Sequence, residues 1–92
     1  MVRTQLSVTA ENTFSSKFRV EGGKPFKVGI VQGTADSTVT VREYDTDGTT
    51  VIDTQTMTAS KIIDTADGAL YDVGVATGDF GSGTCLITVR QM

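Results

Sequence analysis

Histidine is absent from this chain of 92 residues, and cysteine occurs once, as Cys85. A single cysteine cannot form a disulfide within the chain, so a disulfide scaffold does not fit the sequence. Without histidine, the chain also lacks the most common metal ligand and the usual acid–base group near neutral pH. A zinc fold therefore does not fit either.

Tryptophan is also absent, and the aromatic residues, Phe and Tyr, make up 7% of the chain. The core must therefore consist mainly of Val, Ile and Leu with a few aromatic rings. A chain of this size buries only about two thirds of the surface that its extended form exposes. We expect a single domain, residues 1–92, whose thin core can gain stability from binding partners.

Positive charge is scarce, because 8 Lys and Arg stand against 11 Asp and Glu and give a net charge of −3. Nucleic-acid binding depends on basic residues that neutralise phosphates, and no run of them occurs here. We therefore predict no nucleic-acid partner. The basic residues lie scattered along the sequence: Arg3, Lys17, Arg19, Lys24, Lys27, Arg42, Lys61 and Arg90.

Long apolar runs are missing as well. The first twelve residues, MVRTQLSVTAEN, lack the apolar stretch of a signal peptide. No segment approaches the roughly 20 apolar residues of a membrane span. We predict no membrane partner and a chain that is made and used in solution.

The sequence does contain alternation with a period of two, which is typical of half-buried strands. Three segments show it most clearly: 37–44, 69–76 and 84–91. In the second segment, the face formed by residues 70, 72, 74 and 76 is expected to point to solvent. The faces expected to point to the core are Val39 and Val41; Ala69, Tyr71, Val73 and Val75; and Cys85, Ile87 and Val89. The last strand is preceded by a bend at Gly78, Gly81 and Gly83.

Further strands are expected to begin at Gln5, Thr13, Phe26, Thr50 and Lys61. About seven to eight short strands at a spacing of about ten residues, with no amphipathic helical stretch, predict an all-β fold. We expect an antiparallel β-sandwich, Ig-like or jelly-roll-like, with no significant helix. A small barrel is the alternative.

The clearest local prediction is a hairpin of residues 38–44 and 50–56, closed by the turn Asp45-Thr46-Asp47-Gly48. Turns of this kind place a glycine at positive φ, and we expect Gly48 to take that conformation.

Two short motifs imitate phosphate or metal sites. Asp79–Gly81 spells DFG, a metal-binding triplet of kinases, but this chain is too short for a kinase and the triplet is expected to form a turn. Gly22–Lys24 spells GGK, yet Phe18 stands where a P-loop has its first glycine.

Cys85 has no histidine to act as its base and is expected to be a buried, inert thiol.

The carboxylates suggest two further kinds of site, a calcium site and a glycosidase-like pair. Asp45 and Asp47 could give two oxygens to Ca²⁺, but no loop has the ligand count that the ion needs, and we expect solvated turn aspartates. The additional ligands considered are Asp64, Asp67, Asp72 and Asp79. A glycosidase-like pair could come from Asp36, Glu43 and Asp53, but the chain lacks the aromatic residues that usually line a sugar cleft. We therefore predict no enzyme activity and no catalytic, cofactor-binding or metal-binding residue.

The segment Ser37–Gln91 resembles the small all-β virion structural proteins of tailed bacteriophages. The resemblance lies in STVTVREYDTDGTTVIDT and ALYDVGVATGDFGSGTCLITVRQ, which combine a threonine-rich strand, an Asp-x-x-Gly-Thr-Thr hairpin and a Gly-Asp-Phe-x-Ser-Gly bend before a last strand. Val51 stands where the family hairpin usually carries tryptophan.

The resemblance implies a structural role in a virion. We expect a capsid decoration (cement) protein that contacts the major capsid protein and copies of itself as a homo-oligomer, and that uses no cofactor. It would be made in the host cytoplasm and reside on the outer capsid surface. The alternatives are a neck, tail or head-fibre component and a carbohydrate-binding module. Tyr44 and Phe80 are the aromatic residues nearest to turns that could stack on a sugar.

Overall fold

The structure, a computed structural model, describes residues 3–92. In this range the chain forms nine strands and no helix. The strands are β1 (Arg3–Val8), β2 (Thr13–Phe14), β3 (Phe18–Arg19), β4 (Phe26–Val31), β5 (Val39–Tyr44), β6 (Val51–Met57), β7 (Lys61–Ile63), β8 (Leu70–Val75) and β9 (Cys85–Gln91).

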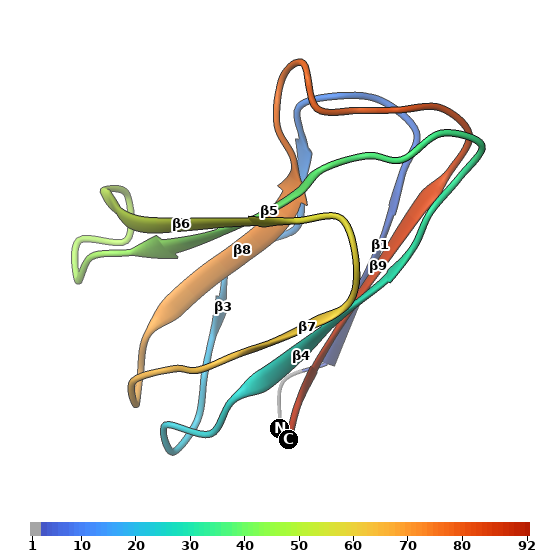
Figure 1. Cartoon of the computed structure of the whole chain (residues 1–92). Helices are drawn as coiled ribbons and strands as arrows, with labels where there is room; N and C mark the ends of the chain where they lie inside the picture. The colour runs from blue at the N-terminus through green and yellow to red at the C-terminus, as the bar shows by residue number, and fades with distance from the viewer. Residues whose placement is uncertain (1–2) are drawn as a thin grey trace.

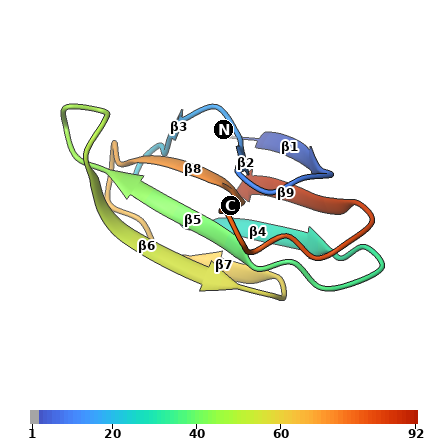
Figure 2. The same ribbon diagram turned by 90° about the horizontal axis from the view of Figure 1, so that it is seen from above.

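The strands form two antiparallel sheets. The four-stranded sheet has the order β1-β9-β4-β7, and the five-stranded sheet has the order β2-β8-β5-β6, with β3 also paired to β8. The two sheets lie in separate layers (Figure 1), and in the view from above β5 and β6 lie in front of β4 and β7 (Figure 2). The predicted all-β sandwich is confirmed, and the sheets do not close into the alternative barrel.

The number of strands is higher than predicted because the strand expected to begin at Thr13 is two strands. β2 and β3 pair with the same edge of β8, at its two ends. Between them, Ser15 holds the chain to β8: its N–H donates to the Val73 carbonyl (2.8 Å), and its hydroxyl accepts from the Val73 N–H (3.2 Å). A side chain thus replaces part of the ladder and interrupts the strand.

The core lies between the layers and is rich in valine, as the composition implied. The predicted inward faces of β5 and β9 are confirmed, since Val39, Val41, Cys85, Ile87 and Val89 are all at most 2% exposed. At one end of the core, the rings of Phe18, Phe26 and Tyr71 contact one another, with centroids 5.1–6.2 Å apart. This aromatic cluster supplies the bulk that the missing tryptophan would otherwise give.

The prediction that β8 is half-buried is wrong. Residues 71–75 are all buried, including Asp72 and Gly74 on the face that was expected to be exposed. The reason is that Arg42 and Tyr44 bond to Asp72, while β2, which pairs with the edge of β8, brings Phe14 against Gly74. A Cβ on Gly74 would come within 2.6 Å of a ring carbon of Phe14, so the glycine leaves room for that ring.

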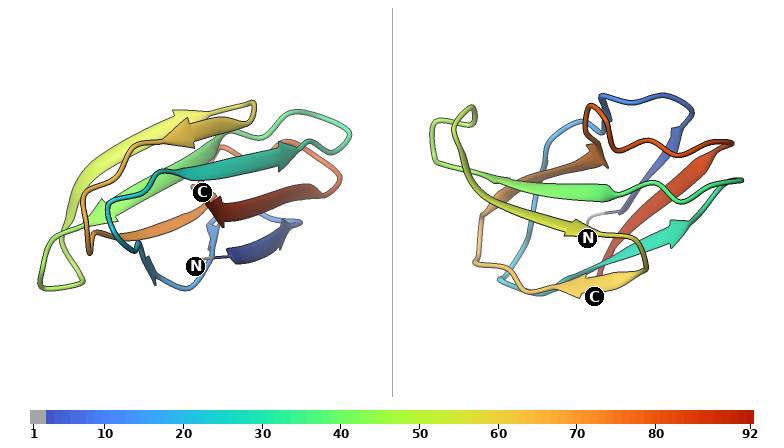
Figure 3. Two further views of the ribbon diagram at one scale, coloured as in Figure 1. Left: turned by 90° about the horizontal axis from the view of Figure 1, so that it is seen from below. Right: turned by 45° about the horizontal axis from the view of Figure 1, so that its top comes forward.

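The hairpin of β5 and β6 is confirmed. The strands pair in antiparallel register from Val39 opposite Met57 to Tyr44 opposite Val51, with a bulge near the turn. Gly48 has φ 75°, as predicted. The tip of this hairpin projects beyond the rest of the sandwich in both views of Figure 3.

Candidate functional site

The outer face of the five-stranded sheet carries a compact charged cluster. Arg42 of β5 and Asp72 of β8 are opposite each other in the ladder. The Arg42 Nε donates to Asp72 Oδ1 (2.9 Å), and its Nη2 donates to Oδ2 (2.7 Å). The Tyr44 hydroxyl also donates to Oδ2 (2.8 Å). Asp72 therefore accepts three hydrogen bonds and is an unavailable ligand for the calcium ion considered above.

Aromatic rings cover this cluster. The Arg42 guanidinium lies 3.6 Å from the centroid of the Phe14 ring, and Lys17 Nζ lies 4.4 Å from that of Tyr44. The hydrogen bonds to Asp72 raise the pKa of Arg42, and burial is the main cause of the raised pKa of Tyr44. Both shifts favour the protonated forms of Arg42 and Tyr44, the forms that donate to Asp72. Tyr44 is buried in this cluster and Phe80 packs against the core, so neither is an open sugar-stacking platform.

The turn aspartates of the β5–β6 hairpin bind their own backbone. Asp47 Oδ1 accepts hydrogen bonds from the N–H groups of Thr49 and Thr50, both at 2.8 Å, and Asp45 Oδ1 accepts from Thr46 N–H (2.7 Å). The bonds from Thr50 and Thr49 lower the pKa of Asp47 to about 2. Within residues 3–92, no group of three or more acidic or cysteine side chains could hold a metal ion.

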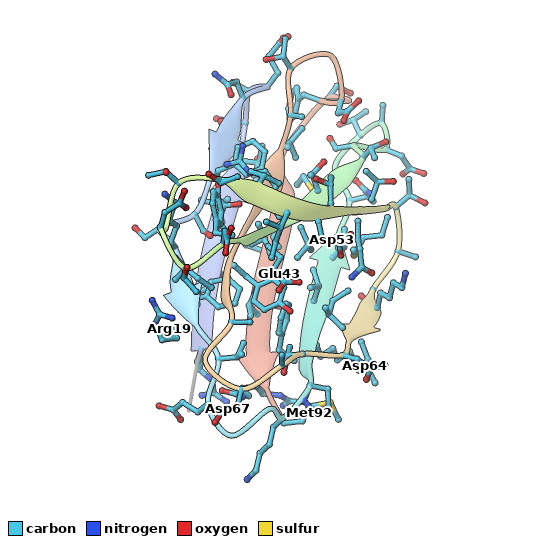
Figure 4. All side chains as sticks on the ribbon, turned by 90° about the vertical axis from the view of Figure 1, so that its left-hand side faces the viewer. Arg19, Glu43, Asp53, Asp64, Asp67 and Met92 are labelled. Atoms are coloured by element: carbon cyan, nitrogen blue, oxygen red, sulfur yellow. The ribbon has the colours of Figure 1, made fainter. Side chains whose placement is uncertain are left out.

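The remaining aspartates considered for calcium serve other contacts or lie apart. Asp67 Oδ1 accepts from Gly22 N–H (2.9 Å), and the Asp79 carbonyl accepts from Thr38 N–H (2.9 Å). Asp64 follows β7 and lies near the Asp67 end of the molecule in Figure 4.

Two of the three carboxylates considered for catalysis do come together. Glu43 of β5 and Asp53 of β6 are direct cross-strand partners, and both are labelled in Figure 4. Tyr71 is opposite Glu43 on the other side, and burial, followed by these two carboxylates, raises the pKa of Tyr71 to about 12. Asp36 is exposed before the opposite end of β5. None of these three carboxylates lines the hollow on the other sheet, over β1, β9 and β4.

The two imitation motifs are both connections. Asp79–Gly81 lies between β8 and β9, where Gly81 N–H donates to the Ser37 hydroxyl (2.8 Å). Gly22–Lys24 joins β3 to β4, with Gly22 and Gly23 at positive φ. The Gly22 N–H is occupied by the Asp67 carboxylate rather than open to a phosphate. Cys85 is fully buried, as predicted, and burial raises the pKa of its thiol.

The outer face of the four-stranded sheet carries rows of side chains that do not take part in the packing between the two sheets. Its register sets three rows across the strands. A cationic row contains Arg3, Arg90 and Lys27, which are consecutive cross-strand partners. The middle row is Gln5, Thr88 and Gly29, and an apolar row follows with Ser7, Leu86 and Val31.

A hollow of about 690 Å³ lies on this face and is lined by residues of the cationic and middle rows together with Val31 and Ser60. The geometry is consistent with it, because the middle row ends in the short side chain of Thr88 and in Gly29, which has none. Thr88 already occupies the space above Gly29, since a Cβ built there would lie 2.5 Å from the Thr88 hydroxyl. The face is toward the viewer in the left panel of Figure 3.

The cations of this row form no ion pair among the described residues. Within residues 3–92 one ion pair is present, Arg42 with Asp72, so Arg3, Lys27 and Arg90 form none with a described carboxylate. All three are exposed. The sequence interpretation of scattered basic residues missed this row, because only the register of β1, β9 and β4 brings the three together.

Comparisons of the chain with protein-family models, with curated proteins and with solved structures found no match. Residues 3–92 contain no helix with the length and apolar character needed to cross a membrane.

Proposed function

We propose that this chain is a non-enzymatic structural protein that decorates a bacteriophage capsid by binding the outer surface of the major capsid protein lattice. The supporting observation is the outer face of the four-stranded sheet, where a cationic row, a hollow and exposed apolar residues lie together. Val31 is 63% exposed and Ile62, opposite Lys27, is 52% exposed. Arginine beside apolar side chains is typical of protein interfaces.

The virion setting comes from the resemblance of Ser37–Gln91, which spans β5 to β9. The energetics are compatible with it. A small domain with a valine-rich core gains free energy from any partner that binds only its folded state, and this gain is about 2.7 kcal/mol at a partner concentration one hundred times the dissociation constant. Copies of the chain bound side by side on a lattice would form the expected homo-oligomer.

Co-sedimentation tests the proposal. Shells assembled from the major capsid protein of the same genome, empty of DNA, are mixed with the purified domain and pelleted. We expect saturable binding at a copy number proportional to that of the capsid protein, because the contact is with the repeated lattice. Shells packed with DNA should bind equally well.

Other outcomes separate the alternatives. Binding in a few copies at one vertex would replace decoration with a neck or tail role. A domain that stays in the supernatant but binds a glycan array would replace it with sugar binding.

A further inference from the structure

The cationic row is unfavourable for the isolated domain. Strands in a sheet are about 4.8 Å apart, so Arg3, Arg90 and Lys27 project three positive charges from Cα positions that span only about 10 Å. Like charges that are directly opposite on neighbouring strands destabilise a sheet. With no ion pair to a described carboxylate, the row is a local concentration of positive charge on a chain whose net charge is −3.

The surroundings of the row restrict what can neutralise it. One flank of the hollow is the cationic row, and Val31 of the apolar row lines the opposite side. An extended peptide that lies along the floor, over Gly29 and Thr88, would direct successive side chains to opposite flanks, because side chains alternate in an extended chain.

We propose that the hollow binds an extended segment of a partner protein in which acidic and apolar residues alternate. This inference rests on the proposed function, in that the capsid protein is the partner expected to supply the segment. Side chains on one side of an extended chain are about 6.8 Å apart, so two carboxylates fit within the length of the row. The apolar side chains between them contact the opposite side of the hollow at Val31, the cross-strand partner of Leu86.

The chemistry favours a peptide over nucleic acid. A phosphate backbone would meet the apolar row on one flank, and the negative net charge of the domain would oppose the rest of a long polyanion.

The probe for the test is a capped, fluorescently labelled peptide in which Glu and Val alternate. Its control, the block peptide, has the same composition but carries all Glu residues first and all Val residues after them. Fluorescence anisotropy gives the affinity, and amide NMR spectra locate the peptide. We expect shifts at Lys27, Gly29, Thr88 and Arg90, and weaker binding of the block peptide. Affinity should fall as salt rises, because the contact is between exposed charges.

Two substitutions of different kind should each weaken binding about tenfold. Arg90→Glu reverses the central charge of the row. Gly29→Val fills the floor without a change of charge; because a Cβ there would lie 2.5 Å from the Thr88 hydroxyl, circular dichroism must first show that this variant folds. The matched control is Arg19→Glu on the other sheet, which makes the same charge change and should keep the affinity within about twofold. Arg90→Gln, which should bind at an intermediate level, replaces Arg90→Glu if circular dichroism shows that the latter does not fold.

Three results would each overturn the proposal. They are equal binding of the block peptide, unchanged affinity of both Arg90→Glu and Gly29→Val, and a short DNA duplex that binds more tightly than the peptide. Sedimentation of the domain alone is the remaining measurement, since a dimer that Arg90→Glu abolishes would assign the hollow to a second copy. Failure of the capsid proposal looks different. In that case the peptide binds the hollow, but the domain does not bind the shells. Conversely, shells that bind wild type and Arg90→Glu equally well would support capsid decoration and contradict the proposal that the hollow makes the contact.

Discussion

Asp72 carries its charge in the middle of the five-stranded sheet, with a side chain that is 4% exposed. The guanidinium of Arg42 and the hydroxyl of Tyr44 satisfy both of its oxygens. The buried side-chain polar atoms of residues 3–92 all have hydrogen-bond partners. The cluster therefore fixes how β5 and β8 align, because any other register would leave this carboxylate buried and unpaired.

Asp72→Asn should destabilise the domain by about 2 kcal/mol, less than the loss of a fully buried pair, because the Arg42 side chain is 30% exposed and can be hydrated. Tyr44→Phe removes one hydrogen bond and should cost about 1 kcal/mol. Urea unfolding measures both. Equal stability of Asp72→Asn and wild type would mean that the ion pair does not contribute to folding.

The surroundings of Gly74 in β8 leave no room for a side chain. A Cβ there would lie 2.2 Å from the Thr13 carbonyl oxygen and 2.6 Å from the Phe14 Cα, both of which are backbone atoms. Gly74→Ala should therefore cost about 2 kcal/mol or more by displacing β2. Gly68→Ala is the matched control. At φ 76° with no atom nearby, it should cost only about 1 kcal/mol. The prediction fails if the two variants melt at the same temperature.

At the scale of the element, the β5–β6 hairpin has a turn whose stability depends on pH. The pKa of Asp47 is about 2 in the folded protein, below its ordinary value of 3.8, so the ionised form is favoured by folding. Its contribution is present above pH 3.8 and is lost as the pH falls toward 2.

Melting temperatures of wild type and Asp47→Asn should therefore differ most above pH 4 and converge near pH 2. Thr50→Val removes the hydroxyl donor to Asp47 and should lose part of the same dependence. A gap between wild type and Asp47→Asn that is as wide at pH 2 as at neutral pH would show that the charge of Asp47 does not hold the turn.

β6 is an edge strand, and its Asp53 is on the inner face opposite Glu43. The repulsion between these carboxylates weakens the pair, but an inward-pointing charge also discourages edge-to-edge association. Asp53→Val should keep or raise the melting temperature and increase light scattering on storage, because it adds to exposed Val51 and Ile52. Asp53→Asn should also keep or raise the melting temperature, but it should not increase light scattering. If Asp53→Val stays as monodisperse as Asp53→Asn, the edge-protection role is wrong.

At the scale of the whole molecule, the features predicted from the sequence were those that depend on near neighbours in the chain. The alternation of Val39 with Val41 and of Cys85 with Ile87 predicted two inner faces correctly, and the glycine of the Asp-Thr-Asp-Gly turn predicted its positive φ. These features follow from strand periodicity and turn geometry, which act over a few residues.

Features that depend on distant segments were not predictable. Asp72 is buried beside Arg42, whose guanidinium stacks on Phe14 of β2, and the cationic row forms because β1 and β4 both pair with β9. Neither arrangement leaves a local signal in the sequence. The pairing of Glu43 with Asp53 could have been derived, since the predicted hairpin needed only its register.

The outer face of the four-stranded sheet is the proposed contact with a capsid, and imaging the particle tests this claim most directly. A reconstruction of the intact particle at a resolution that separates strands would place the domain on the shell. Our account predicts copies across the lattice with β1, β9 and β4 against the capsid protein and a segment of it in the hollow beside Arg90. Copies that turn this sheet to solvent, or particles that lack the chain, would contradict it.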